Sequence, residues 1–223
     1  LILKKFLPVF GAHPLSNTFN EALVLLVEGE DDERIWQSVV RSSRGTIKVF
    51  PCVCGDVQSI AEYERDVNSV ISSVYDNATA YSLRDKDNAD ETDLSDEGAV
   101  IRLRLKCRAV ENLLLADEVI ASTEAGSWAK VEERLEAWVE SAPDNPYVQK
   151  VVDFQAGGYD RKNFDLKDIR NILLLQTGES KPWEILVGQA MSNLTWSDTT
   201  DFAVGNTLYS YLGEKIVKAL FPK

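Results

Sequence analysis

The sequence contains a single histidine, His13, in 223 residues. Chemistries that need paired imidazoles or a Ser-His-Asp triad are therefore not expected. Cysteines are also few. The chain has three, an odd number: Cys52, Cys54 and Cys107. A zinc site needs four ligands, and we expect no such site in this chain. We expect three reduced, buried and chemically inert thiols in a cytoplasmic protein.

Long apolar runs and an excess of basic charge are absent as well. No run approaches the roughly eighteen residues of a transmembrane helix, so no membrane partner is expected. The start, LILKKFLPVFGAHPL, is not a secretory signal, because Pro8 and Gly11 interrupt its apolar stretch. Lys and Arg number 24 against 36 Asp and Glu, which gives a net charge of −12. A nucleic-acid role then requires a local basic surface, a bound cation or a basic partner.

What is present is an alternation of strand-like and helix-like patterns. The apolar run 22–27 shows no period of two, which is typical of a parallel strand covered on both faces. The order strand, helix, strand, helix, strand predicts an α/β fold with a parallel sheet. Strands are predicted at 22–27, 46–53 and 78–84, and helices at 31–42 and 57–74, the second with Asp56 as its N-cap.

The second half of the chain has a different character. Residues 85–97 contain seven acids and one Lys, and residues 100–108 (VIRLRLKCR) alternate cations with apolar groups. A strand with this period of two carries its cations on one face. From 109 to about 170 the pattern is helical, Ile172–Leu175 is expected to form a last strand, and helices are predicted at 182–192 and 205–220.

Carboxylates follow two of the predicted strands directly. Glu28 leaves the first strand, Asp32 lies four residues further on, and Asp85 and Asp87 leave the third strand. In a doubly wound sheet these strand ends share one edge, where ligands bind. Crowded carboxylates repel one another, and a hard divalent cation such as magnesium relieves the repulsion. Each motif alone also fits a solvated helix start or a surface loop; an EF-hand does not fit, because Asp90 stands where the turn needs Gly.

The string LLVEGEDD, followed further along by LRDKD, resembles the TOPRIM domain of topoisomerases, bacterial primases and several nucleases. That domain has a Glu after its first strand and a DxD after its third, which Glu28, Asp85 and Asp87 match. The resemblance runs from about residue 20 to 115. It implies a TOPRIM-like (Rossmann-like) parallel sheet.

The remainder resembles the overcoming-lysogenization-defect (OLD) nucleases and related TOPRIM proteins fused to ABC-type ATPases. That group has a second acid after the first Glu, matched by Asp32, an acid on a later helix, offered by Glu111, and a late Lys near a Gly, offered by Lys181. The sequence departs from the pattern at Glu179–Ser180, which separates Gly178 from that Lys. Glu111 also fits an ordinary first-turn helix acid, and Lys181 an ordinary surface Lys.

The predicted activity is a divalent-metal-dependent DNA endonuclease. Hydrolysis of a phosphodiester needs an activated water and neutralised charge, and two divalent ions supply both. Lys181 would be a fixed cation beside the phosphate. The alternating cations would contact DNA, although such a pattern is also typical of a half-buried strand. The expected ligands of two Mg²⁺ or Mn²⁺ ions are Glu28, Asp32, Asp85, Asp87 and Glu111, and the expected DNA-contacting residues are Arg102, Arg104, Lys106 and Arg108.

Because the chain does not begin with Met, we expect it to be a fragment of a longer protein. The resemblance to the OLD nucleases implies an N-terminal ABC-type ATPase region before it, with a homodimer formed through that region. Two alternatives stay open, an RNA-processing TOPRIM nuclease and a non-catalytic acidic α/β interaction module. A topoisomerase is disfavoured, because nothing marks a nucleophilic Tyr and its companion DNA-cleavage domain. The expected organisation is a linker at 1–20, a TOPRIM catalytic core at 21–110, a helical insertion at 111–170, and a last strand with C-terminal helices at 171–223.

Overall fold

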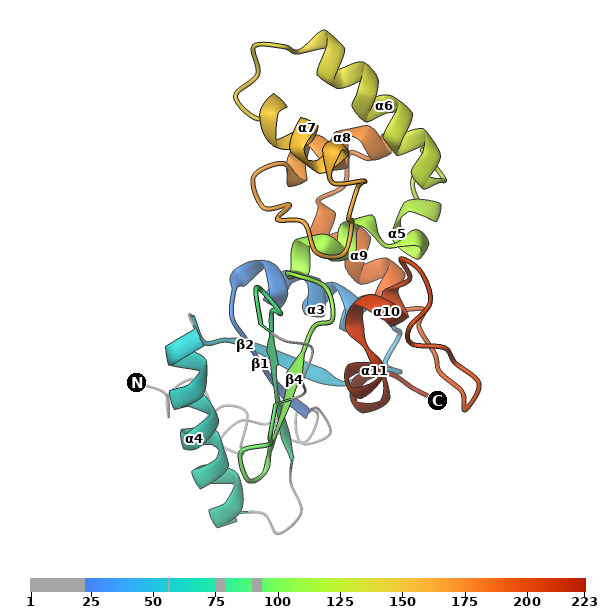
Figure 1. The fold of residues 1–223 in the computed structure, drawn as a ribbon. Coiled ribbons are helices and arrows are strands. Elements are labelled where there is room, and N and C mark those ends of the chain that lie inside the picture. Colours follow the sequence, from blue (N-terminus) through green and yellow to red (C-terminus); the bar gives the residue numbers. More distant parts are fainter. Residues whose placement is uncertain (1–22, 56, 75–78, 90–93) are drawn as a thin grey trace.

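A computed structural model describes residues 23–55, 57–74, 79–89 and 94–223. It shows a four-stranded, all-parallel sheet flanked by helices, with a helical lobe beyond one end of the sheet (Figure 1). The predicted α/β class is confirmed, and the arrangement is consistent with a TOPRIM-like or Rossmann-like fold. The linker expected at 1–20 and the predicted N-cap Asp56 lie outside the described residues.

The strand order in the sheet is β2-β1-β3-β4, so the first and third strands are neighbours. The last four residues of β1 are buried, as expected for a parallel strand with helices on both faces. Parallel pairing brings the C-terminal ends of all strands to the same edge. The strands are β1 (Leu23–Val27), β2 (Val49–Val53), β3 (Ala80–Arg84) and β4 (Val100–Arg104).

Helices α3 (Glu30–Ser42) and α4 (Val57–Val74) cover opposite faces of the sheet. Because side chains alternate along a strand, Leu25 and Val27 join the core that contains α3, and Leu26 joins a smaller core with α4. Two separate cores on the two faces therefore hold the sheet in a three-layer arrangement.

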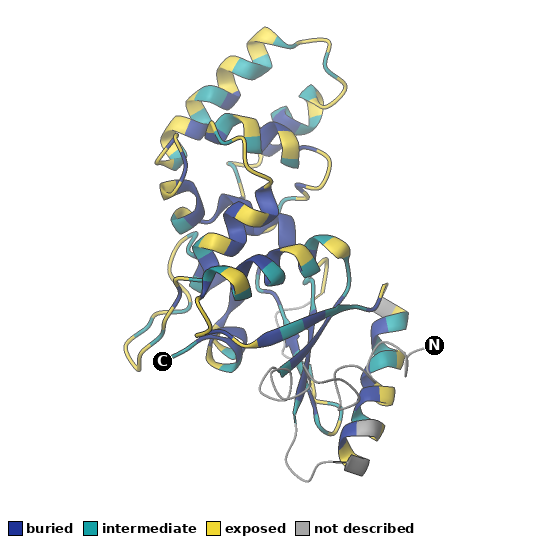
Figure 2. Cartoon of the chain, turned by 180° about the vertical axis from the view of Figure 1, so that it is seen from behind, coloured by how far each residue is buried: buried dark blue, intermediate teal, exposed yellow. Residues whose placement is uncertain are grey.

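The remaining helices build the C-terminal half. In Figures 1 and 2 a helical lobe stands away from the sheet, and the elements between lobe and sheet are largely buried. Helix α9 packs closely on α3, since a Cβ at Gly188 would lie only 2.7 Å from the carbonyl oxygen of Ile35. No helix in the described part of the chain is long and apolar enough to cross a membrane. The elements are η1 (Val110–Leu115, a 3-10 helix), α5 (Asp117–Ala121), α6 (Trp128–Ser141), α7 (Val148–Ala156), α8 (Arg170–Thr177), α9 (Trp183–Met191), α10 (Leu208–Leu212) and α11 (Glu214–Leu220).

The expected last strand at Ile172–Leu175 is wrong, because these residues lie inside helix α8. Ile172 and Leu173 are buried whereas Leu175 is 67% exposed, which is the one-sided burial of a surface helix. A short apolar run does not by itself distinguish a strand from a buried helix segment.

Two further predicted elements are shorter than expected. The strand predicted at 100–108 ends at Arg104, because the backbone N–H groups of Lys106 and Cys107 donate to the carbonyl oxygen of Tyr211. The single helix predicted at 205–220 is two helices, α10 and α11, divided at Gly213. Gly213 has a φ of +82°, and a Cβ there would meet the Lys106 side chain at 2.6 Å. That position therefore requires glycine.

Candidate functional site

The carboxylates predicted from the sequence lie at the C-terminal edge of the sheet. Glu28 directly follows β1, Asp85 directly follows β3, and these strands pair with Leu26 opposite Ser82. Glu111 belongs to η1, which follows the end of β4. The topology thus brings together acids that are far apart in the sequence, as the doubly wound arrangement predicts.

Asp32 lies in the first turn of α3 and is buried. Its Oδ2 accepts a hydrogen bond from the backbone N–H of Gly29 at 3.3 Å, which ties the acid to the turn between strand and helix. Burial, together with the charge of Glu28, raises the pKa of Asp32 to about 7. A proton is therefore held on this carboxyl group near neutral pH unless another cation replaces it.

Asp85 is fixed by the backbone as well. Its Oδ1 accepts a hydrogen bond of 3.0 Å from the N–H of Val110. Burial and the charges of Asp32, Glu28 and Glu111 raise the pKa of Asp85 well above its usual range. Burial also raises the pKa of Glu28, and the charge of Asp87 adds to that effect. The acids at this edge therefore repel one another when they are ionised.

Asp87 adopts a left-handed backbone conformation with a φ of +48°. Its N–H donates a 2.7 Å hydrogen bond to the carbonyl oxygen of Arg108, which joins the segment after β3 to the segment after β4. Asp tolerates this region better than most residues, yet it is uncommon outside glycine. Such conformations concentrate at functional sites, which supports a role for this loop.

A small cavity opens between these two segments. Its volume is about 140 Å³, and Asp85, Asp87 and Glu111 line it together with Arg108 and Lys167. A water molecule occupies roughly 30 Å³ in the liquid, so the space suits ions and a few waters rather than a nucleotide. Asp165 lines the cavity as well and lies 4.0 Å from Arg108. A lining of carboxylates and basic side chains is suited to a cation and a phosphate group.

Arg170 is a residue that the sequence did not single out. Its Nη1 lies 2.8 Å from Asp31 Oδ2 and 3.7 Å from Glu111 Oε1, and its guanidinium lies 4.8 Å above the ring of Trp183. Arg170 begins helix α8, which belongs to the lobe. No motif or period in the sequence marks it, because its position depends on how the lobe packs on the sheet.

Lys181, the predicted fixed cation, is exposed in the turn between α8 and α9. Within the described part of the chain, no ion pair or hydrogen bond joins it to the five predicted carboxylates. The cation that contacts a predicted ligand from the lobe is Arg170, through Glu111.

Carboxylates are suitable ligands for a divalent metal ion, but these acids are not arranged around a common point in the present structure. Among the described residues, no group of three or more His, Cys, Asp or Glu side chains is already disposed to hold a metal ion. The donor set is nevertheless composed of carboxylate oxygens, the ligands that Mg²⁺ prefers. The raised pKa values of Glu28, Asp32 and Asp85 reflect burial and repulsion that a bound cation would offset.

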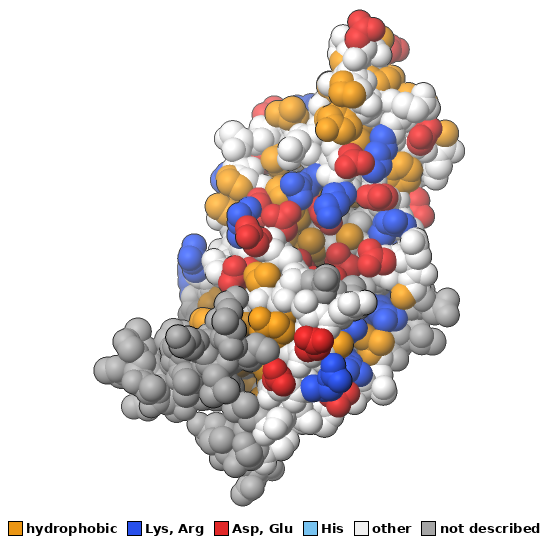
Figure 3. Space-filling view, turned by 90° about the vertical axis from the view of Figure 1, so that its left-hand side faces the viewer, with side chains coloured by type: hydrophobic (Ala, Val, Ile, Leu, Met, Phe, Trp, Pro, Cys, Tyr) orange, Lys and Arg blue, Asp and Glu red, His pale blue; other side chains and the backbone are white. Residues whose placement is uncertain are grey.

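The four alternating cations do not form the single exposed face expected from their period. The side chain of Arg102 is only 19% exposed and pairs with Glu64 and Glu97. Arg108 lies beyond the end of β4 and lines the acidic cavity, and Lys106 lies against Gly213. The expectation of one face is wrong because the strand stops at Arg104. On the face drawn in Figure 3, basic side chains are interspersed with acidic ones.

The three cysteines are free, in agreement with the prediction. Cys54 and Cys107 are buried and Cys52 is half-buried. Burial raises the pKa of the Cys107 thiol, and the charge of Asp85 adds to it. A thiol kept protonated in this way is a poor nucleophile.

Comparisons with known proteins find a similarity among solved structures. The sequence matches no protein-family model, and no curated protein matches it. Among solved structures, the chain is similar to the C-terminal region of the OLD protein of Xanthomonas campestris pv. campestris. The similarity covers 80% of this chain and 86% of that chain, with 15% sequence identity and a TM-score of 0.31. These values are too low to assign a function or a residue role to this chain.

Proposed function

We propose that this chain is a divalent-metal-dependent endonuclease domain of the TOPRIM type that hydrolyses phosphodiester bonds in DNA. The observation that supports the proposal is the convergence of Glu28, Asp32, Asp85 and Glu111 at one sheet edge. There the charges of Glu28 and Glu111 add to burial in raising the pKa of Asp32 and of Asp85. Strongly perturbed carboxyl groups cluster at functional sites. A bound cation stabilises the ionised carboxylates of such a cluster, because it offsets their mutual repulsion.

The proposed ligands of one or two Mg²⁺ or Mn²⁺ ions are the five carboxylates. Such ions, when bound, supply an activated water and neutralise charge on the phosphate. The chain itself orients the carboxylates, since the N–H groups of Gly29 and Val110 hold Asp32 and Asp85. The five are Glu28, Asp32, Asp85, Asp87 and Glu111.

Cations at the rim of the cavity complete the proposed site. Arg108 and Lys167 line it together with the acids, and we propose that they contact phosphate oxygens of a bound strand. A fixed cation that stabilises the transition state is proposed on the lobe side, with Arg170 and Lys181 as the two candidates. Arg170 is favoured because it contacts Glu111.

The wider setting is proposed from the sequence resemblance. It comprises an N-terminal ABC-type ATPase region of the same protein, a homodimer formed through that region, and a cytoplasmic location. A net charge of −12 is compatible with DNA binding only if metal ions, local cations or this additional region supply positive charge.

Plasmid nicking in the presence of Mg²⁺ or Mn²⁺ tests the proposal. The parent chain should nick supercoiled DNA, Asp85→Asn should not, and Asp144→Asn, which changes an exposed acid in the lobe, should retain parental activity. Cleavage of RNA but not DNA under the same conditions would support an RNA-processing nuclease. Equal behaviour of parent and Asp85→Asn, with no effect of either ion on thermal stability, would support a non-catalytic module.

A further inference from the structure

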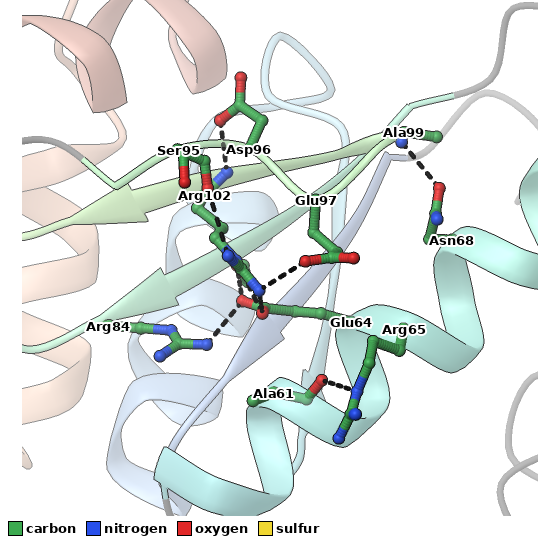
Figure 4. Close-up of polar contacts among 11 residues, drawn as sticks. Ala61, Glu64, Arg65, Asn68, Arg84, Ser95, Asp96, Glu97, Ala99 and Arg102 are labelled. Carbon is green, nitrogen blue, oxygen red and sulfur yellow. Dashed lines mark hydrogen bonds and ion pairs between the residues drawn. The ribbon is translucent and has the colours of Figure 1, made fainter.

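A buried carboxylate, that of Glu64, lies on the α4 side of the sheet (Figure 4). Glu64 has no exposed surface, and it accepts hydrogen bonds from Ser82 Oγ at 2.5 Å and from Arg84 Nη2 at 2.9 Å. Arg102 adds a third, from its Nε at 2.8 Å. Figure 4 shows Glu64 reaching from α4 toward the side chains of both arginines. A buried charge needs such partners, since an unpaired one is costly.

The network keeps Glu64 ionised. Burial raises the pKa of Glu64, but the hydrogen bonds from Arg102, Ser82 and Arg84 outweigh it and leave the pKa below its usual value. One negative charge is therefore shared between two guanidinium groups. Arg102 also has other acceptors, Glu97 Oε2 at 3.1 Å and the carbonyl oxygen of Ser95 at 3.3 Å. The ion pair and the hydrogen bond described for Arg84 both go to Glu64.

The register of the strands places Arg84 beside the acidic edge. The last paired residues of β1 and β3 are Leu26 and Ser82, and Glu28 and Arg84 each lie two residues beyond them, at the C-terminal end of their strands. Side chains two apart along a strand share one face. Arg84 pairs with Glu64 of α4, and it lies close enough to Glu28 for its charge to act on that carboxyl group. The positive charge of Arg84 lowers the pKa of Glu28 against the larger effect of burial.

The Arg84 guanidinium could therefore compete with a metal ion for the carboxylate of Glu28. A guanidinium bound to Glu28 would occupy carboxylate oxygens that a metal ion needs. The observed ion pair of 2.9 Å with Glu64 directs it elsewhere. Without that partner, a half-buried guanidinium would turn to the neighbouring carboxylate, because leaving it unpaired is costly.

We propose that Glu64 is a positioning residue, which holds Arg84 away from Glu28 and so keeps that carboxylate available to a divalent cation. The inference rests on the proposed function, because it concerns the same acidic edge. Glu64 itself does not contact the metal, and its effect passes through Arg84.

Glu64→Gln tests this role, because it removes the charge and conserves the volume. In a crystal structure of the metal-free variant, the Arg84 guanidinium should lie within ion-pair distance of Glu28. The affinity for Mn²⁺, measured by isothermal titration calorimetry without substrate, should fall about tenfold. Adding Arg84→Met to Glu64→Gln should restore the affinity to within about twofold of the parent, since double-variant cycles isolate a pairwise effect. A purely structural role of Glu64 would not produce this rescue.

Ser82→Ala is the matched control, because it removes one hydrogen bond from Glu64 without releasing Arg84; Mn²⁺ affinity should stay parental. If Glu64→Gln does not fold, Arg84→Met alone should bind Mn²⁺ as tightly as the parent or more tightly. A tenfold loss of Mn²⁺ affinity in Arg84→Met would contradict the positioning role of Glu64. A crystal structure of Glu64→Gln in which Arg84 stays away from Glu28 would contradict it too. A parent chain that binds no Mn²⁺ would instead overturn the proposed metal-dependent function.

Discussion

Asp85 Oδ1 accepts a hydrogen bond of 3.0 Å from the backbone N–H of Val110, so the acid at the end of β3 is tied to the short helix that carries Glu111. This contact holds a carboxylate in a buried position that its neighbours' charges disfavour. The backbone hydrogen bond therefore keeps Asp85 close to other acids that repel it when they are ionised. Such an arrangement is expected where a cation binds after folding.

Asp85→Asn should abolish metal-dependent cleavage and leave the domain folded. The Asn side chain still accepts the Val110 N–H, and the loss of one crowded charge relieves repulsion, so stability should hold or rise by about 1 kcal/mol at pH 7. Chemical denaturation in EDTA and plasmid nicking measure the two effects. Retained cleavage at matched Mg²⁺ would contradict the assignment of Asp85.

Asp32 should make the metal-free protein less stable as the pH rises. Its pKa is about 7 in the folded state against an ordinary value of 3.8, so folding favours the protonated form. That contribution is fully present below about pH 4 and is lost as the pH rises through 7. The free energy of unfolding in EDTA should fall over this range by about 1–3 kcal/mol more in the parent than in Asp32→Asn. Parallel curves for the two proteins would show that Asp32 titrates normally.

Divalent ions should stabilise the parent chain in a pH-dependent way. A ligand present at one hundred times its dissociation constant stabilises the folded state by about 2.7 kcal/mol. Protons compete for Glu28, Asp32 and Asp85, so the stabilisation by Mn²⁺ should be smaller at pH 5 than at pH 7.5. Thermal unfolding with and without Mn²⁺ at both pH values measures this difference, with Asp144→Asn as a control that keeps it. An equal shift at both pH values would indicate binding outside the acidic edge.

Arg102 and Arg108 should behave differently although both were expected to contact DNA. Arg102→Gln removes a partner of the buried Glu64 and should cost about 1–3 kcal/mol of stability, with little change in the salt dependence of DNA binding. Arg108→Gln, at the acidic cavity, should leave stability nearly unchanged and reduce the salt slope by about one unit. Denaturation curves and binding isotherms over a salt series separate the two. The opposite assignment would restore Arg102 to the nucleic-acid interface.

Arg170 and Lys181 are the two candidates for the fixed cation on the lobe side. Arg170→Gln should lower the cleavage rate about a hundredfold, because this guanidinium contacts Glu111 and is shielded from solvent by Trp183. Lys181→Gln should have a smaller effect, because an exposed charge is screened. Single-turnover cleavage at saturating Mn²⁺ compares them, and a larger loss in Lys181→Gln would return the role to that residue.

Much of the site follows from local properties of the sequence. The apolar run before Glu28 and the strand before Asp85 predict buried parallel strands, and parallel pairing forces their C-terminal ends to one edge. The convergence of these acids could be predicted on the condition that the first and third strands are neighbours, and the sheet order shows that they are. Whether they hold a metal ion stays a prediction, since the described residues contain no ready-made ligand group.

The sequence by itself determined the α/β class, the faces of the central strands and the acids at their ends, because hydrophobic periodicity and strand direction are local. Only the tertiary structure decided that Arg102 is half-buried and paired with the buried Glu64, since a period of two defines two faces but not the helix that covers one of them. It also decided that Ile172–Leu175 is helical and that Arg170 reaches Glu111. These outcomes depend on packing between segments far apart in the chain, which no local pattern encodes.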